Sequence, residues 1–494
     1  MKTKILYLGV LALLAVGCFG VDDENYPTLT PISITAASDT INADLGVELV
    51  YSGVKVESDL ECTYEWAYGA PASGTTVADR KFASIETIST SPTIDYTFTK
   101  IGTYILRLKI DNGEAIEYSY FTLNVNSGYD EGICILNNDD EGNGSLTFIK
   151  TLTSEDIANG VQEVYEDVFG SINPAYKLKN ATALYMSDYT IKSVDYSGLL
   201  IATNDGEGTI YDVEAQTFEM FSVESMAEYG TYGVEFGGEI ASTSAFGSFF
   251  RSADGRIFRF DMQLGYLAEM DDIDPSIDRC YGALSATSSS AASSITNIMF
   301  NADTVCARVT ASAGPRYLSF DGYNVVNVAA TRYGTVSKAL YILLQDKADP
   351  TSYKTMTTAV SNSACRSSAA GRSFTIDDLK MDINSKMVNV KASNDVYYTY
   401  DNAIYRWSLT TAPGTSPAVN VPSGEQIVDI ASNFMGKAKG SDGESLLYIA
   451  TYNPSRSGKK GSLYVVDLSV DEIVKSYEGI CDTPVSVIYK YRVN

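Results

Sequence analysis

The distribution of apolar and polar residues predicts short β-strands over most of the chain. From residue 129 onward one unit recurs, consisting of an apolar strand, a Gly/Asn/Asp turn and a second strand. Clear copies are GICILNNDDEGNGSLTFIK (132–150), GLLIATNDGEGTIYDV (198–213) and AFGSFFRSADGRIFRFD (245–261). The copies recur about every 50 residues, which is the spacing of a four-stranded propeller blade. We therefore expect a β-propeller over residues 128–494, with seven blades, or six or eight because the fourth and fifth copies are irregular.

Residues 28–127 show the same alternation without the repeat. Aromatic and apolar residues occupy every second position in 62–68 and again in 104–110, and Asp-Asn-Gly at 111–113 supplies a hairpin turn. The return strand places Phe121, Leu123 and Val125 on one side. This pattern predicts a small β-sandwich, and the chain as a whole is predicted to be all-β. A single short helix is expected at 154–167.

The sandwich resembles a known domain type. The stretch YTFTKIGTYILRLKIDNGE (96–114), after YEW (64–66), is similar to the last core strands of PKD-type immunoglobulin-like domains. The resemblance implies that Trp66 belongs to the core of the sandwich.

The first 27 residues have the organisation of an export signal and a linker. Lys2 and Lys4 precede an apolar run over 5–16 that is too short for a stable membrane span, and small residues lead to Cys18. This resembles the lipobox of bacterial lipoproteins, which implies a signal peptide over 1–17 and lipidation of Cys18. The linker 18–27 carries acids at 22–24, which resemble the surface-export signal of Bacteroidota lipoproteins.

The charge and the absence of histidine exclude several functions. The net charge is −26, so the surface repels nucleic-acid phosphates and we expect no nucleic-acid partner. With no histidine in the chain, neither a Ser-His-Asp or Cys-His catalytic set nor an imidazole metal site can form. We select no catalytic residues, no metal ligands and no cofactor.

The cysteines and the acidic loops are explained more simply by structure than by metal binding. The seven cysteines lie far apart, so buried thiols are favoured over a metal site, and a Cys134–Cys481 disulfide is an open alternative. The loops NNDDEGNG (137–144) and EMDDIDPSID (269–278) offer the oxygen ligands that Ca²⁺ requires, but the first lacks a closing acid, because Phe148 stands at its twelfth position, and solvated loops are favoured for both. Whether either binds Ca²⁺ stays open.

Two aromatic loops are the candidate ligand-binding sites. In AEYGTYGVEFGG (227–238), glycines surround Tyr229, Tyr232 and Phe236, as in a mobile or tightly turned binding loop. The loop TRYGT (331–335) offers Arg332 and Tyr333. Tyrosine suits these positions because its ring stacks on a sugar or peptide while its hydroxyl forms hydrogen bonds.

A resemblance of the whole chain suggests a function. The hairpin at 132–149 is similar to the first hairpin of YncE-like propellers, and the order of signal, PKD-like module and propeller resembles accessory surface lipoproteins of Sus-type nutrient-uptake systems. The resemblance implies an outer-membrane, cell-surface protein that binds an oligosaccharide or peptide beside a TonB-dependent transporter and its lid lipoprotein. The alternatives are a glycosidase or lyase that uses carboxylates and tyrosine, and a purely structural subunit.

The strand count also predicts how the propeller closes. The last blade has four strands without PVSVIYKYR (484–492), whereas the first blade begins abruptly and lacks its innermost strand. We expect residues 484–492 to supply that strand, because closure removes unpaired strand edges.

The Cys18 assignment predicts the cellular location of a variant. Cys18→Ala should move the protein from the membrane fraction to the soluble fraction, because each buried acyl methylene contributes roughly 0.8 kcal/mol to membrane binding. Fractionation followed by immunoblotting measures this, with protease treatment of intact cells as the assay for surface display of the wild type. Retention of the variant in the membrane fraction would contradict lipid anchoring at Cys18.

Overall fold

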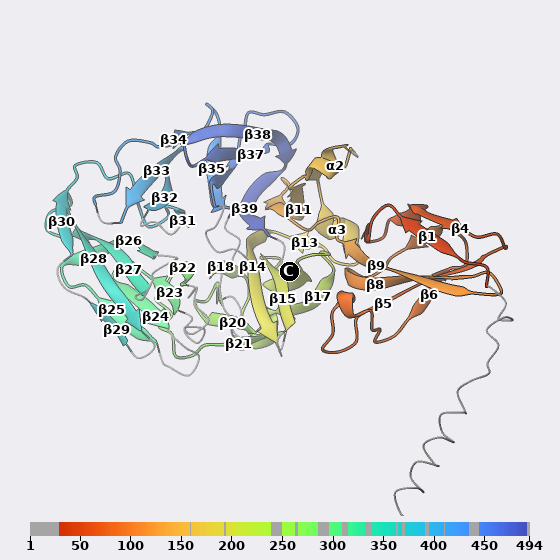
Figure 1. The fold of residues 1–494 in the computed structure, drawn as a ribbon. Helices are drawn as coiled ribbons and strands as arrows, with labels where there is room; N and C mark the ends of the chain where they lie inside the picture. The colour runs from red at the N-terminus through yellow and green to blue at the C-terminus, as the bar shows by residue number, and fades with distance from the viewer. Residues whose placement is uncertain are drawn as a thin grey trace, which may run out of the picture. The chain divides into compact units, whose positions relative to one another are not determined.

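The computed structural model covers the chain in two compact units, Met1–Gly128 and Tyr129–Asn494. It describes residues 29–491 except 159, 192–193, 239–248, 262–264, 285–295, 309–314, 331–337, 362–363, 368–370, 391–394, 410 and 434–443. The signal segment 1–17, Cys18 and most of the linker therefore lie outside the described residues. Both units are built almost entirely of strands (Figure 1). None of the described helices is long and apolar enough to span a membrane.

The smaller unit contains three sheets around one apolar core. Its strands are β1 (Ser33–Ala36), β2 (Thr40–Asp44), β3 (Glu48–Tyr51), β4 (Val54–Glu57), β5 (Thr63–Gly69), β6 (Glu86–Ser89), β7 (Ile94–Thr97), β8 (Gly102–Asp111) and β9 (Ile116–Asn126). The order β2-β9-β8-β5-β6 forms the main sheet, and β1-β4 and β3-β7 form two-stranded sheets. Trp66 is fully buried beside Phe121 and Leu108, because alternate residues of β5, β8 and β9 face the core.

The described part of the larger unit contains seven antiparallel sheets. The first is β39-β10-β11-β12, with β13 also paired to β11, and the others are β14–β17, β18–β21, β22–β25, β26–β29 with β30, β31–β34 and β35–β38. The strands of the first three sheets are β10 (Gly132–Asn138), β11 (Asn143–Lys150), β12 (Val164–Tyr165), β13 (Leu178–Lys179), β39 (Thr483–Lys490), β14 (Ala181–Ile191), β15 (Val194–Thr203), β16 (Thr209–Glu214), β17 (Met220–Ser225), β18 (Val234–Gly238), β19 (Phe249–Ser252), β20 (Ile257–Asp261) and β21 (Tyr266–Glu269). Those of the other four are β22 (Arg279–Leu284), β23 (Thr296–Phe300), β24 (Thr304–Arg308), β25 (Arg316–Ser319), β26 (Tyr323–Ala330), β27 (Lys338–Asp346), β28 (Ser352–Ser361), β29 (Ala364–Ser367), β30 (Arg372–Thr375), β31 (Met387–Val390), β32 (Asp395–Tyr400), β33 (Ala403–Ser408), β34 (Val419–Asn420), β35 (Gln426–Ser432), β36 (Leu446–Tyr452), β37 (Gly461–Asp467) and β38 (Glu472–Cys481).

The first strands of these sheets form a closed series. In order, β39, β14, β18, β22, β26, β31 and β35 each lie next to the following one, and β35 lies next to β39. Each sheet therefore extends outward from a common centre, as Figure 1 shows for the larger unit. The larger unit is a β-propeller.

The ends of the larger unit meet in one sheet. Strand β39 pairs antiparallel with β10, placing Ile488 opposite Cys134 and Lys490 opposite Gly132. A second link joins β39 to the preceding sheet, because the buried Asp429 of β35 accepts a hydrogen bond from the Val487 amide at 2.9 Å. The C-terminal strand is thus bonded to the first sheet and to the last.

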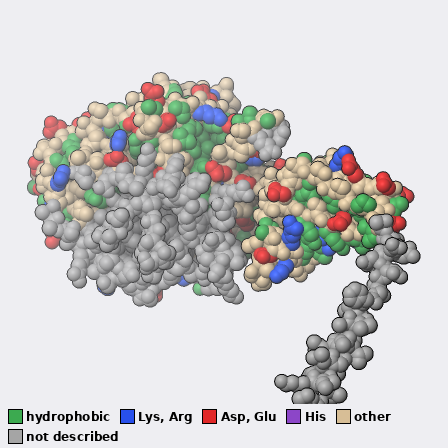
Figure 2. Space-filling model, in the orientation of Figure 1, with side chains coloured by type: hydrophobic (Ala, Val, Ile, Leu, Met, Phe, Trp, Pro, Cys, Tyr) green, Lys and Arg blue, Asp and Glu red, His purple; other side chains and the backbone are tan. Residues whose placement is uncertain are grey.

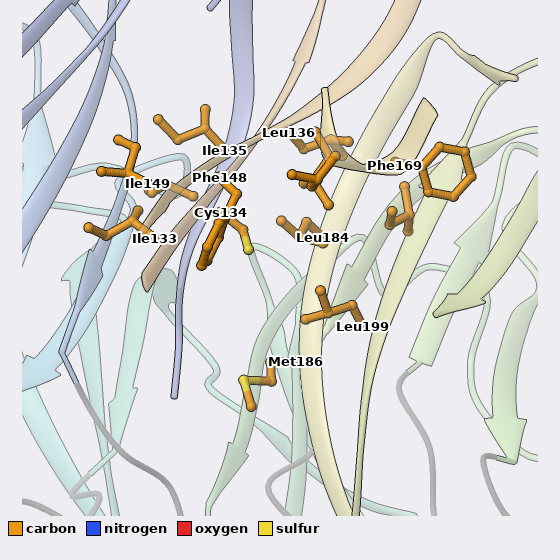
Figure 3. Close-up of a cluster of buried hydrophobic side chains, with 14 of the residues drawn as sticks. Ile133, Cys134, Ile135, Leu136, Phe148, Ile149, Phe169, Leu184, Met186 and Leu199 are labelled. Atoms are coloured by element: carbon orange, nitrogen blue, oxygen red, sulfur yellow. The ribbon is translucent and has the colours of Figure 1, made fainter. Parts of the chain in front are cut away.

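The core at this closure is almost wholly apolar. Side chains from β10, β11, β14 and β15 gather there, as Figure 3 shows for Cys134, Phe148, Leu184 and Leu199 among others. Cys134 and Cys481 are both buried and both are free thiols, so the disulfide alternative is wrong in this structure.

The outer edge of the first sheet differs from the expectation of one helix at 154–167. Two single-turn helices, α2 (Ser154–Ala158) and α3 (Val168–Ile172), flank the short strand β12. The predicted helix is broken near its end because Asp167 starts a new one. Its carboxylate accepts a hydrogen bond from the Gly170 amide at 3.0 Å and so caps the N-terminus of α3. The strands β12 and β13 pair with only part of the outer edge of β11. The helix α3 packs against β11 and covers the rest of that edge.

The closure generates a test of stability. Deleting residues 483–494 should lower the melting temperature of the propeller by roughly 5–10 °C or more, because a buried strand and its ladder are lost. The transition of the smaller unit should not move, and differential scanning calorimetry can follow both. Deletion of 492–494 alone is the matched control, and equal melting of the two truncated proteins would contradict a stabilising role for β39.

Candidate functional site

The topology places several predicted loops at one end of the propeller. In each sheet, the turn between the second and third strands and the connection to the next sheet lie at the same end, because neighbouring strands are antiparallel. We call this end the turn face. It carries the acidic turn 139–142, the aromatic loop 226–233 between β17 and β18, and the acidic loop 270–278 between β21 and β22.

The aromatic loop has a fixed backbone rather than a mobile one. It begins with the 3₁₀ helix η2 (Met226–Tyr229), whose start is capped by the Ser225 hydroxyl accepting from the Ala227 amide at 3.1 Å. Gly230 ends the helix with a φ of 73°, a conformation that favours glycine. At Gly233, also at positive φ, a Cβ would lie 2.6 Å from the Asn204 side-chain oxygen. Gly230 therefore serves the left-handed turn that ends η2, and Gly233 serves both a positive φ and close packing of the loop.

Tyr229 is a packing residue of this loop. Its ring lies edge-on to Phe258 at a centroid distance of 5.3 Å, and its hydroxyl donates a hydrogen bond to the Leu267 carbonyl of the neighbouring sheet. Burial raises the pKa of Tyr229, with the carboxylates of Glu224 and Glu228 adding to the effect. In this structure both the ring and the hydroxyl of Tyr229 are thus engaged within the protein, and ligand binding by Tyr229 stays a prediction.

Arg256 fastens the loop to the adjacent turn. Its guanidinium donates to the Tyr229 carbonyl at 3.0 Å and pairs with Asp254 at 3.0 Å and Glu269 at 3.4 Å. Partial burial opposes ionisation of Asp254, but hydrogen bonds from Ser252, Thr231 and Arg256 outweigh it and lower the pKa to about 2. The carboxylate stays charged at any physiological pH, and the anchor with it.

Tyr232 is the candidate residue that the loop exposes. Its side chain is 58% exposed, on a backbone held by Tyr229 and Arg256. Phe236 lies in β18, but its side chain is outside the described part of the structure, as are Arg332 and Tyr333. Of the five aromatic and cationic candidates, the structure thus exposes Tyr232 and packs Tyr229, and all five stay predictions as ligand-binding residues.

Carboxylates of the acidic loops form hydrogen bonds and an ion pair with other groups of the protein. Asp139 accepts hydrogen bonds from the Glu141 and Asn143 amides at 3.0 and 2.7 Å, and Asp274 accepts one from the Ser276 amide at 2.9 Å. Asp140 lies 3.3 Å from Lys460. Among the described residues, no group of three or more acids or thiols is arranged to hold a metal ion. Many other carboxylates remain at the surface, as Figure 2 shows for the described face of the larger unit.

A buried carboxyl that the sequence analysis did not identify lies in the core between the second and third sheets. Asp212 of β16 is 2% exposed, and its Oδ2 atom has no hydrogen-bond partner in the structure. It lies opposite Leu200 and two residues from Ile210, both members of the core between the second and third sheets. Burial raises its pKa to about 7. The signal in the sequence was an acid at a core-facing position of the alternating stretch TIYDV (209–213).

The raised pKa of Asp212 does not make it a general acid in this structure. A catalytic acid must come within hydrogen-bond distance of the substrate. Asp212 is instead enclosed between two sheets among aliphatic and aromatic side chains, with 2% of its surface exposed. Its expected effect is on stability.

Comparison with known proteins gives distant structural similarities alone. No protein-family model and no curated protein matches the chain. Among solved structures, it is similar to a quinoprotein alcohol dehydrogenase-like protein of Bacteroides thetaiotaomicron, with 15% identity, coverage of 95% of this chain and 99% of that chain, and a TM-score of 0.41. It is also similar to a 6-phosphogluconolactonase-like protein of Bacteroides uniformis, with 11% identity, coverage of 73% and 99%, and a TM-score of 0.43. At these values neither name bears on the activity of this chain.

Asp212 predicts an unusual pH dependence. An aspartate in the unfolded chain titrates near pH 4, whereas Asp212 in the folded chain titrates at about 7. Between these values the folded state keeps a proton that the unfolded state has lost, so the free energy of unfolding contributed by this group falls as pH rises from about 4 to about 7. Asp212→Asn should remove this loss and raise stability at pH 8 by on the order of a few kcal/mol.

Urea unfolding of the propeller at pH 5 and pH 8 measures this difference. Asp321→Asn, an exposed aspartate in the turn before β26, is the control and should be neutral. An Asp212→Asn protein that is less stable than the wild type at pH 8 would show that the charged carboxylate has a stabilising partner.

Proposed function

We propose that this chain is a lipid-anchored protein of the outer-membrane surface that takes part in nutrient uptake. In this proposal, Cys18 carries the anchor, the smaller unit is an Ig-like, PKD-like spacer, and the larger unit is a seven-bladed propeller with one blade per sheet. The propeller binds an oligosaccharide or peptide, or docks on a TonB-dependent transporter and its lid lipoprotein. Contact is made through the turn face.

The observation that carries the proposal is the exposure of Tyr232 on a rigid loop. A ring that is 58% exposed would normally be a cost to solubility, whereas a preordered aromatic residue loses little entropy on binding. The fixed anchors at Tyr229 and Arg256 supply that order. Tyrosine is also among the residues enriched at binding hot spots.

The enzymatic alternative has less support among the described residues. A glycosidase that uses two carboxylates needs both groups accessible at the same sugar ring. Asp212, whose pKa is raised by burial, is enclosed, and the turn-face acids Asp139 and Asp274 are engaged with backbone amides. The purely structural alternative makes a different prediction for Tyr232, which gives the proposal its test.

Affinity purification in mild detergent tests the proposed function. The wild-type protein should recover a TonB-dependent transporter after gentle crosslinking, and Tyr232→Ala should reduce the recovery by about ten-fold, the effect of losing roughly 1.4 kcal/mol at a contact. The control is Tyr176→Ala, which removes another partly exposed tyrosine of the propeller.

The outcomes separate the alternatives. Recovery by the wild type that Tyr232→Ala does not change would place the contact elsewhere and support the purely structural reading. A wild-type protein that always purifies alone would contradict importer docking.

A further inference from the structure

The main sheet of the smaller unit has an outward face with an unusual composition. In β9, Phe121, Leu123 and Val125 face the core, so the residues of opposite parity face outward. These are Ile116, Tyr118 and Tyr120, of which Ile116 is 49% and Tyr118 46% exposed. We call these three residues the aromatic ledge. Its sequence signal is IEYSYFTLNV (116–125), in which apolar and aromatic residues occupy one face of the strand at first and then the other.

The two rings of the ledge are aligned. Their centroids lie 6.5 Å apart and their planes are inclined by only 29°. They therefore present a common orientation along the strand, as a row of rings does when it supports an extended ligand. The strand is held by its pairing with β8 along ten positions, which include the ledge, while β2 pairs with β9 only at residues 122–126.

Positive charge is concentrated beside these rings. The guanidinium carbon of Arg80 lies 5.1 Å from the Tyr120 centroid, and that of Arg107 lies 5.5 Å from the Tyr118 centroid. Arg80 forms no ion pair with any residue that the structure describes. Arg107 pairs with Glu65 at 2.5 Å, but its buried Nε atom has no acceptor. The ledge thus combines ring faces with one guanidinium, that of Arg80, which has no ion-pair partner among the described residues, and a second, that of Arg107, which is already paired with Glu65.

These features specify the chemistry of a ligand. A pyranose ring packs its C–H face against an aromatic ring, whereas a guanidinium binds a carboxylate with two parallel hydrogen bonds. A protein with a net charge of −26 repels polyanions over most of its surface, so a cation such as Arg80, without an ion-pair partner among the described residues, favours an anionic ligand at the ledge. A neutral sugar would use the rings and leave Arg80 idle.

We propose that the aromatic ledge binds acidic polysaccharide, with uronic-acid rings against Tyr118 and Tyr120 and their carboxylates on Arg80 and Arg107. This site lies on the smaller unit and is separate from the turn face of the propeller. It would hold a polymer near the cell surface whether or not the propeller docks on a transporter.

Native gel electrophoresis of the full-length protein in detergent, with polygalacturonate cast in the gel, tests the proposal. At about 0.1 M salt, polygalacturonate should retard the wild type more than highly methyl-esterified pectin does, because esterification removes the carboxylates. Tyr118→Thr, which keeps a strand-favouring residue, should weaken binding by about ten-fold, and Tyr118→Phe should retain it. Arg80→Gln should abolish the preference for polygalacturonate over the ester.

The controls are Tyr266→Ala, an exposed tyrosine of the propeller strand β21, and Lys55→Gln, an exposed lysine of β4. Both should bind like the wild type. The proposal is overturned if polygalacturonate does not retard the wild type, or if Tyr118→Thr is retarded equally. It is also overturned if ledge variants bind polygalacturonate normally but lose a protein partner. Because this assay contains no transporter and leaves Tyr232 intact, its failure is distinguishable from failure of the proposed function.

Discussion

The pairing of β39 with β10 is the interaction on which the propeller depends. A ring of sheets closes, without an open gap between its ends, only if its last strand bonds to its first sheet. The two strands are about 350 residues apart in the sequence, but the entropic cost of bringing two segments together grows only slowly with the length of chain between them. The register places Ile488 opposite Cys134, and the Asp429 carboxylate ties the same strand to the preceding sheet. Every other sheet is then held between two neighbours of fixed position.

Polar groups at this closure define its register. Lys490 is fully buried, and its ammonium donates to the Asp130 carbonyl at 2.8 Å beside the rings of Phe148 and Phe218. Burial lowers its pKa to about 8, while Cys134 and the nearby carboxylates act in the opposite direction. An apolar residue would pack there at lower cost, but it would fit several registers. A one-residue slip of β39 would turn Lys490 toward the other face and remove its acceptor, so the lysine specifies the pairing.

The sequence predicted the features that follow from periodicity and counting. Alternation within 198–213 and its copies indicated repeated hairpins, and the surplus strand at 484–492 indicated which segment lies beside β10. Side-chain use was harder to predict. Tyr229 and Tyr232 lie in the same glycine-rich loop, but Tyr229 packs against Phe258 and bonds to Leu267, whereas Tyr232 is exposed. The loop sequence alone does not predict which tyrosine is packed, because the contacting residues lie about 30 positions further along the chain. The ledge was not predicted either, because the alternation of Phe121, Leu123 and Val125 identifies only the core face of β9, whereas Tyr118 and Tyr120 lie on the opposite face.

The two candidate surfaces display their tyrosines in different ways. Tyr232 lies on a loop whose backbone accepts a hydrogen bond from Arg256, and Tyr118 lies on a strand that pairs with β8. The Tyr118 ring also contacts Tyr120 and lies under the guanidinium of Arg107. The charged neighbours differ as well, because Arg256 next to the loop is paired with Asp254 and Glu269, whereas Arg80 at the ledge has no ion-pair partner among the described residues. An unpaired cation favours an anionic ligand, so this difference in charge, more than the tyrosines themselves, is the reason that the two proposals name different ligands.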